Sequence, residues 1–155
     1  MSVAFRRESD EEHLEPRFEL PVPPGPNLVT ARGLDLIRAR VETLESASGG
    51  GTVGDDAERA RDLRYWRSRL ATAQLTPPAT GDEVGFGSRV RFSLNGREQV
   101  ISIVGDDEAE PAAGRISFSA PLARALMGAG EGDLLPFAGR EDAIEILALE
   151  GVADA

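Results

Sequence analysis

Residues 90–104 read VRFSLNGREQVISIV and decide the fold of the second half of the chain. Apolar residues at positions 90, 92 and 94 alternate with polar ones, as in a strand with one buried face. Asn95-Gly96 is the dipeptide most typical of a two-residue hairpin turn. The apolar run at 100–104 predicts the returning strand. The segment therefore predicts a β-hairpin.

The residues that follow this hairpin predict the rest of a small domain. A third, short strand is expected at 116–118, and a compact helix at 121–127 that Gly128 stops. Two closing strands are expected at 134–137 and 144–149. One helix packed on an antiparallel sheet is an α+β arrangement.

Upstream of the sheet, apolar residues recur at helical spacing in two segments. Thr30 is a plausible N-cap, and apolar residues follow at positions 34, 37, 41 and 44. A glycine-rich stretch, 48–54, interrupts this pattern, and a second helix is expected to start near Asp55 or Asp56. Its apolar seam lies at positions 63, 66, 70 and 73. Two such seams joined by a short loop predict an antiparallel helical hairpin of the coiled-coil type.

The predicted organisation has five parts. These are a flexible acidic and Pro-rich tail at 1–29, the helical hairpin at 30–75, a linker at 76–83, the C-terminal domain at 84–150 and a short tail at 151–155.

Composition excludes several classes of function. The formal net charge is −10 over 155 residues, and every basic side chain is Arg, so independent binding to nucleic acid is not expected. There is no Cys, and His13 is the one histidine, which excludes thiolate chemistry, Cys- or His-rich metal sites and Ser-His-Asp constellations. No apolar run is long enough to span a membrane, and the N-terminus has no signal-peptide core, so we expect a soluble, cytoplasmic protein.

The glycine-rich stretch formally matches G-x-G-x-x-G. A dinucleotide site needs a strand before this pattern, whereas here a helix precedes it, so the stretch is read as a hinge loop. No Gly-Lys-Ser/Thr follows a glycine-rich stretch, so no P-loop is expected.

Asp55, Asp56 and Glu58 form an acidic cluster where the second helix begins. One reading is that these carboxylates complement the helix dipole. The other is that they hold a divalent cation in the active site of a second protein, because Mg²⁺ prefers oxygen ligands.

Arg61, Arg64 and Arg67 recur every three residues along the second helix. Such a row is most often a solvated face with local ion pairs. The alternative is contact with RNA or with an acidic protein surface.

Taken in order, several motifs resemble the GreA/GreB family of transcript-cleavage factors. The segment 28–34, LVTARGL, resembles the start of the family's first helix, and 64–70, RYWRSRL, its second arm. The most specific resemblance lies in the C-terminal domain. It comprises FGSRV at 86–90, IVGDDEA at 103–109, IS at 116–117, PLARAL at 121–126 and EGD at 131–133.

This resemblance implies an FKBP-like C-terminal domain that grips the secondary channel of bacterial RNA polymerase and a coiled coil that enters the channel. Nascent RNA would be met only within that complex. The protein itself would carry no cofactor, any Mg²⁺ belonging to the polymerase active site, and we expect a monomer. The residues implied in polymerase binding are Asp106, Asp107, Glu108, Ser119, Ala120, Pro121 and Arg124.

The chain departs from the family pattern at two places. Ala120 stands where the family usually carries Ser. The hairpin is shorter by about two turns per arm, or roughly 11 Å, and the family's acidic tip motif is not reproduced. We therefore expect a regulator that modulates elongation without transcript cleavage, similar to the short-hairpin regulators of nucleoside diphosphate kinase.

Two alternatives stand beside this reading. The first is an active cleavage factor that supplies Asp55 and Asp56 to the polymerase metal site. The second is an FKBP-like peptidyl-prolyl isomerase. It is disfavoured because fold alone does not carry that activity, and no Tyr or Trp follows residue 84 to line an aromatic pocket.

Overall fold

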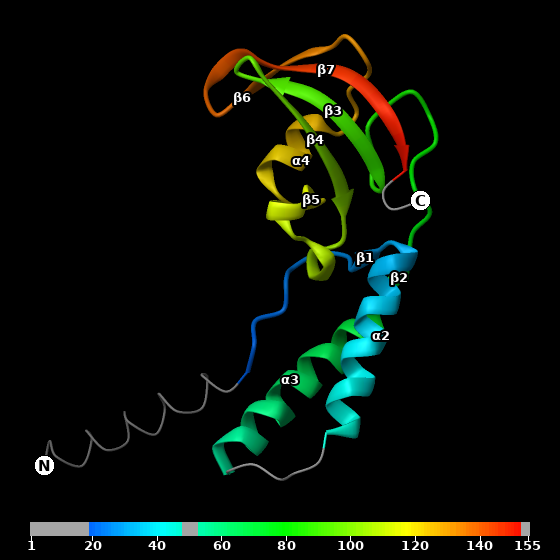
Figure 1. Ribbon diagram of the computed structural model, residues 1–155, viewed down its shortest axis with the longest axis vertical. Helices are drawn as coiled ribbons and strands as arrows, with labels where there is room; N and C mark the ends of the chain where they lie inside the picture. Colours follow the sequence, from blue (N-terminus) through cyan, green and yellow to red (C-terminus); the bar gives the residue numbers. More distant parts are fainter. Residues whose placement is uncertain (1–18, 48–52, 153–155) are drawn as a thin grey trace, which may run out of the picture. The chain divides into compact units, whose positions relative to one another are not determined.

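The structure is a computed structural model that describes residues 19–47 and 53–152 (Figure 1). Contacts divide the chain into two compact units. One joins Met1–Gly25 to Ile37–Thr72, and the other joins Pro26–Leu36 to Ala73–Ala155. Residues 48–52 of the predicted glycine-rich hinge, 48–54, lie outside the described residues.

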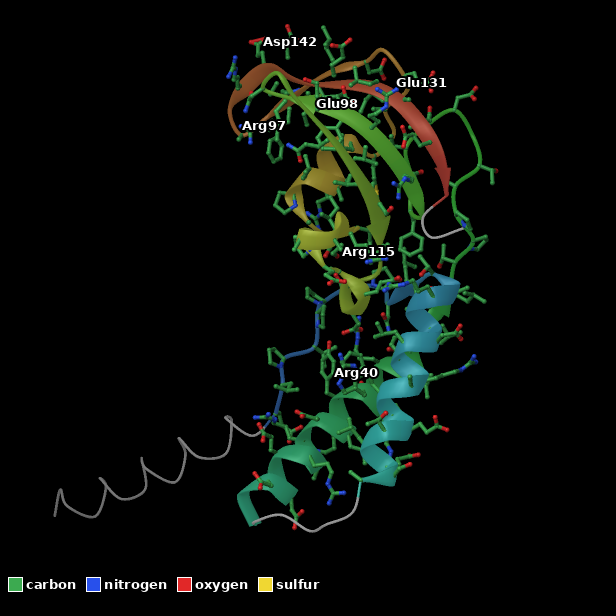
Figure 2. The ribbon with its side chains drawn as sticks, viewed as in Figure 1. Arg40, Arg97, Glu98, Arg115, Glu131 and Asp142 are labelled. Atoms are coloured by element: carbon green, nitrogen blue, oxygen red, sulfur yellow. The ribbon has the colours of Figure 1, made fainter. Side chains whose placement is uncertain are left out.

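The first unit holds the predicted helical hairpin except residues 31–36 of its first helix, which belong to the second unit. Helices α2 (Ala31–Ser46) and α3 (Val53–Thr72) run antiparallel, since Arg59 Nη1 donates to the Ala47 carbonyl at 2.7 Å near one end. Further along, the Arg40 guanidinium lies 5.6 Å from the centre of the Trp66 ring (Figure 2). Of the predicted α2 seam, the residues at 37 and 41 are buried and those at 34 and 44 half-buried.

The second unit contains a five-stranded sheet in the order β5-β4-β3-β7-β6. The strands are β3 (Ser88–Leu94), β4 (Arg97–Val104), β5 (Arg115–Ser117), β6 (Leu134–Phe137) and β7 (Arg140–Val152). All neighbouring pairs are antiparallel except β4 and β5, which pair in parallel. The α+β class is confirmed, and the sheet is mixed where a wholly antiparallel one was expected. The connection after β4 contains two short 3-10 turns, η2 (Asp106–Glu108) and η3 (Pro111–Ala113). It brings the chain back beside Ser102, so that β5 runs in the same direction as β4.

The core of this unit lies between the sheet and the short helix α4 (Pro121–Leu126), which covers one face of it (Figure 1). Alternation along the strands places one set of side chains inside. The buried apolar set is Val84, Val90, Phe92, Ile101, Ile103, Ala123, Leu126, Ala129, Ala143, Ile144 and Ile146. The hairpin turn predicted at Asn95-Gly96 is present, with φ of 51° and 86° at its two residues.

A second, two-stranded parallel sheet joins β1 (Leu28–Val29) to β2 (Gln74–Leu75). Asn27 and Val29 are buried, and Asn27 accepts a backbone hydrogen bond from Gln74 at 2.8 Å. The flexible tail was predicted to extend to residue 29, whereas the structure places its last residues in this sheet. Two-residue strands are too short to show any periodicity, so the sequence pattern could not reveal them.

No helix within the described ranges is both long and apolar enough to cross a membrane.

The β6–β7 turn holds an unusual residue. Ala138 and Gly139 link paired Phe137 and Arg140, and both have positive φ, 52° at Ala138 and 82° at Gly139. Ala138→Gly is expected to stabilise the protein by about 0.5–1 kcal/mol, because glycine adopts this backbone conformation without steric strain. Gly139→Ala should destabilise it, although a methyl group there would meet nothing within 4 Å. Urea midpoints of the two variants test this, and equal midpoints would contradict it.

Candidate partner-binding site

Three polar side chains meet at one surface of the second unit. Asp106 begins η2 and is separated from the end of β4 by one residue. Ser117 ends β5, and Ser119 lies two residues before α4. Ser119 Oγ donates to Asp106 Oδ1 at 2.8 Å, and Ser117 Oγ donates to the same oxygen. The two serine hydroxyls lie 2.8 Å apart, and Ser119 N donates to Ser117 Oγ at 3.0 Å. The carboxylate thereby fixes both hydroxyls, and Ser119 is exposed.

Helix α4 continues this surface. Ala120 is its N-cap residue and has no side-chain capping bond, while Pro121 occupies the first turn. The hydroxyl of Ser119, the residue before Ala120, bonds Asp106. Pro121 and Arg124 are exposed, and Ala120 is half-buried. We refer to Asp106, Asp107, Ser117, Ser119, Ala120, Pro121 and Arg124 together as the serine surface.

Glu108 does not belong to this surface, although the resemblance placed it among the partner contacts. Its side chain is only 1% exposed. Its carboxylate accepts hydrogen bonds from Thr30, Gly105 and Arg32 within the same unit. A buried carboxylate that is already bonded in this way is not available to a partner, so its assignment as a contact residue is corrected.

The acidic cluster lies in the first turns of α3, as predicted. Asp56 Oδ1 lies 3.4 Å from Arg59 Nη2, and Glu58 Oε2 lies 3.6 Å from Arg61 Nη2, both pairs at i,i+3 spacing. Asp55 is exposed. Across residues 19–47 and 53–152, no group of three or more His, Cys, Asp or Glu side chains has a geometry suited to a metal ion. Asp56 and Glu58 thus pair within α3, and the choice between the helix-start reading and the metal reading stays a prediction.

Each arginine of the α3 row has an acidic partner. Arg61 lies 3.2 Å from Asp62, Arg67 lies 2.8 Å from Glu45 of α2, and Arg64 lies 2.6 Å from Glu19. Exposed pairs of this kind contribute little to stability, because solvent screens the charges. Arg64 and Arg67 are exposed and Arg61 is half-buried, and carboxylates of the protein itself pair with all three. The choice between a solvated face and a contact with RNA or an acidic protein surface stays a prediction.

The pair with Arg64 should be visible in a titration. The hydrogen bond from Arg64 holds the pKa of the exposed Glu19 carboxyl below its ordinary value. A carboxyl with a lowered pKa contributes its contact above the ordinary pKa and loses it as pH falls through the lowered one. In an NMR titration, Arg64→Ala should therefore raise the pKa of Glu19. Arg67→Ala is the matched control, because Arg67 pairs with Glu45. An equal rise in the pKa of Glu19 in the Arg67→Ala variant would contradict the assignment.

Two features of this region could not be found from the sequence. Ser117 was read as a strand residue, and its bond to Asp106 depends on the connection between β4 and β5. Thr30 was predicted as an N-cap, and Gly33 N does donate to its hydroxyl at 3.0 Å. The bond from that same hydroxyl to Glu108, 78 residues away, carries no local signal.

The described parts define a class: a helical hairpin combined with an α+β domain that presents a hydrogen-bonded polar surface beside a short helix. The family described as "Transcription elongation factor, GreA/GreB, C-term" matches residues 78–150. The chain belongs to the GreA/GreB family.

Relatives extend this likeness beyond the C-terminal domain. "Transcription elongation factor GreA" of Brucella canis is 44% identical over 128 residues, which cover 72% of this chain and 82% of the relative. The GreA of Desulfovibrio desulfuricans is 36% identical over 109 residues, covering 64% and 67% of the two chains. Among solved structures, "GreA factor homolog 1 (Gfh1)" of Thermus thermophilus is 21% identical, with a TM-score of 0.40 and coverage of 82% of this chain and all of that one.

Proposed function

We propose that this chain binds bacterial RNA polymerase at the secondary channel and modulates elongation. The serine surface is the proposed docking site. The observation that carries this proposal is the Asp106–Ser117–Ser119 arrangement, in which one carboxylate orients two hydroxyls. A set of preoriented polar groups suits recognition of a protein partner, because little side-chain entropy is lost on binding.

The charge of the chain indicates what kind of partner surface would fit. A net charge of −10 favours association with a basic surface and opposes contact with free nucleic acid. We expect the chain to act as a monomer without a cofactor of its own, and to meet nascent RNA only within the polymerase complex.

The hairpin favours regulation without transcript cleavage. Helix α2 has 16 residues and α3 has 20, so the arms are about 24 and 30 Å long. The carboxylates nearest the tip are oxygen ligands of the kind Mg²⁺ takes, but Asp56 and Glu58 already pair with arginines of α3. To help hold a metal of the polymerase they would first have to leave those partners.

A stalled, backtracked elongation complex tests this proposal. Saturating protein is expected to change the rate at which polymerase resumes or pauses, and to leave the length of the stalled transcript unchanged. Shortening that disappears in the Asp55→Ala, Asp56→Ala double variant would instead establish the cleavage-factor alternative. Absence of any effect on the complex would reject both.

A further inference from the structure

The start of helix α2 is bonded to the carboxylate of a residue that lies 78 positions later in the chain, Glu108. Thr30 Oγ1 donates to the two oxygens of Glu108 at 2.9 and 2.7 Å, and Thr30 N donates to Oε2 at 3.3 Å. Arg32 Nη1 lies 3.5 Å from Oε1. Residues 26–36 belong to the same compact unit as Glu108, so these contacts lie within one unit.

This carboxylate supplies what α2 lacks. The first turn of α2 contains no acidic residue of its own, whereas α3 starts with two. A helix N-terminus presents free N–H groups and a partial positive charge, which a carboxylate stabilises. Thr30 caps α2 by accepting from Gly33 N, and Glu108 holds the hydroxyl of Thr30 in place.

The fit around this carboxylate leaves no room for a larger residue at position 33. A Cβ atom on Gly33 would lie 2.2 Å from Glu108 Oε2, far inside contact distance. A Cβ atom on Gly105, which starts the η2 turn, would lie 2.4 Å from the Leu28 carbonyl oxygen. Gly105 therefore lets the backbone of the η2 turn approach that of Leu28, and Gly33 leaves the space that the Glu108 carboxylate occupies.

The three residues of the η2 turn thus contact two different parts of the unit. Asp106 bonds the serines of the serine surface, and Glu108 bonds the start of α2. The turn that shapes the proposed docking surface is also the turn that fixes the first residues of the helical hairpin.

We propose that Glu108 is a positioning residue: it locks the start of α2 to the η2 turn, so that docking at the serine surface also holds the first turn of α2. This inference rests on the proposed function. Glu108 acts through α2 and does not touch the polymerase. Its loss should leave docking intact and impair the effect that the docked hairpin has on elongation.

The test compares Glu108→Ala, Gly33→Ala and the double variant in the full chain. Each single variant is expected to keep its affinity for core polymerase within about threefold of wild type. At saturating protein, each should reduce the elongation effect by about fivefold or more, the lower end of typical coupling between sites. A residue that merely supported the fold would lower affinity and effect together.

The double variant makes the test specific. Glu108→Ala removes the carboxylate that an alanine at position 33 would strike, so the double variant should be no worse than Glu108→Ala alone. Glu108→Gln keeps the volume and one acceptor oxygen and should restore part of the effect. Glu110→Ala is the matched control, since it removes a negative charge from an exposed residue in the same connection.

Additive losses in the double variant, or a parallel fall in affinity, would overturn the proposal. Hydrogen exchange at the first-turn amides of α2 separates this outcome from failure of the proposed function. If wild-type protein did not act on polymerase, faster exchange in both single variants, and no further increase in the double variant, would still establish the lock. Unchanged exchange in Glu108→Ala would refute it.

Discussion

Replacing Phe92 with alanine is expected to destabilise the C-terminal unit by about 3–5 kcal/mol. Phe92 lies in the middle of β3, the central strand, and its side chain is fully buried among core residues from β4, β7 and α4. The cost combines lost burial with the cavity left behind. Because domains of this size are stable by only about 5–15 kcal/mol, the variant should be largely or partly unfolded at moderate temperature.

Chemical denaturation followed by circular dichroism measures this loss. Phe92→Leu is the conservative comparison and should cost less than about 1.5 kcal/mol if neighbours repack. Leu134→Ala is the exposed control, since Leu134 is 55% exposed on the edge strand β6. A Phe92→Ala variant as stable as the Leu134→Ala variant would show that the core is not where the structure places it.

Asp106→Ala is expected to weaken binding to core polymerase by about tenfold or more, which corresponds to at least about 1.4 kcal/mol. The substitution removes a negative charge and releases the hydroxyls of Ser117 and Ser119 that this carboxylate orients. A charged group that is hydrogen-bonded at the centre of an interface typically has an effect of this size or larger. Ser119→Ala removes one of those hydroxyls and should have a smaller effect.

Titration of core polymerase with labelled protein measures the affinity. Glu141→Ala is the matched control, because it removes the same charge from an exposed position on β7, outside the serine surface. Raised salt should weaken wild-type binding more than that of Asp106→Ala, since the variant has already lost one charge contact. If Asp106→Ala and Glu141→Ala bound core polymerase with equal affinity, the serine surface would not be part of the interface.

The elements with a strong repeating pattern were predictable. The alternation around Phe92 and the Asn95-Gly96 turn located β3 and β4, and β6 was predicted at its observed bounds, 134–137. The second helix was expected near Asp55 or Asp56 and begins at Val53. In each case the signal is local: alternating apolar residues and a turn dipeptide for β3 and β4, a short apolar run for β6, and acidic residues after a glycine-rich stretch for α3.

The features that depend on distant partners were not predictable. Strand β1 is only two residues long and exists because β2, 46 positions later, lies beside it (Leu28 pairs with Gln74). Glu108 looked like Asp106 and Asp107 in sequence, an acidic residue in an exposed turn, yet it is buried and the other two are half-buried. Glu108 differs from the two aspartates because Thr30 and Gly33 lie beside it in the folded chain. The segments 30–33 and 106–108 are too far apart in sequence for a local pattern to reveal this contact.

Site-specific photo-crosslinking in a reconstituted elongation complex tests the central claim most directly. The full chain would carry a photoreactive residue at position 124 in the serine surface, at position 55 in the first turn of α3, or at position 141 as the control. We predict that position 124 crosslinks to the rim of the polymerase secondary channel, position 55 to its interior, and position 141 to neither. The account would be contradicted if positions 124 and 55 crosslinked to polymerase surfaces away from the channel. It would also be contradicted if their crosslinking yield were no higher than that of position 141.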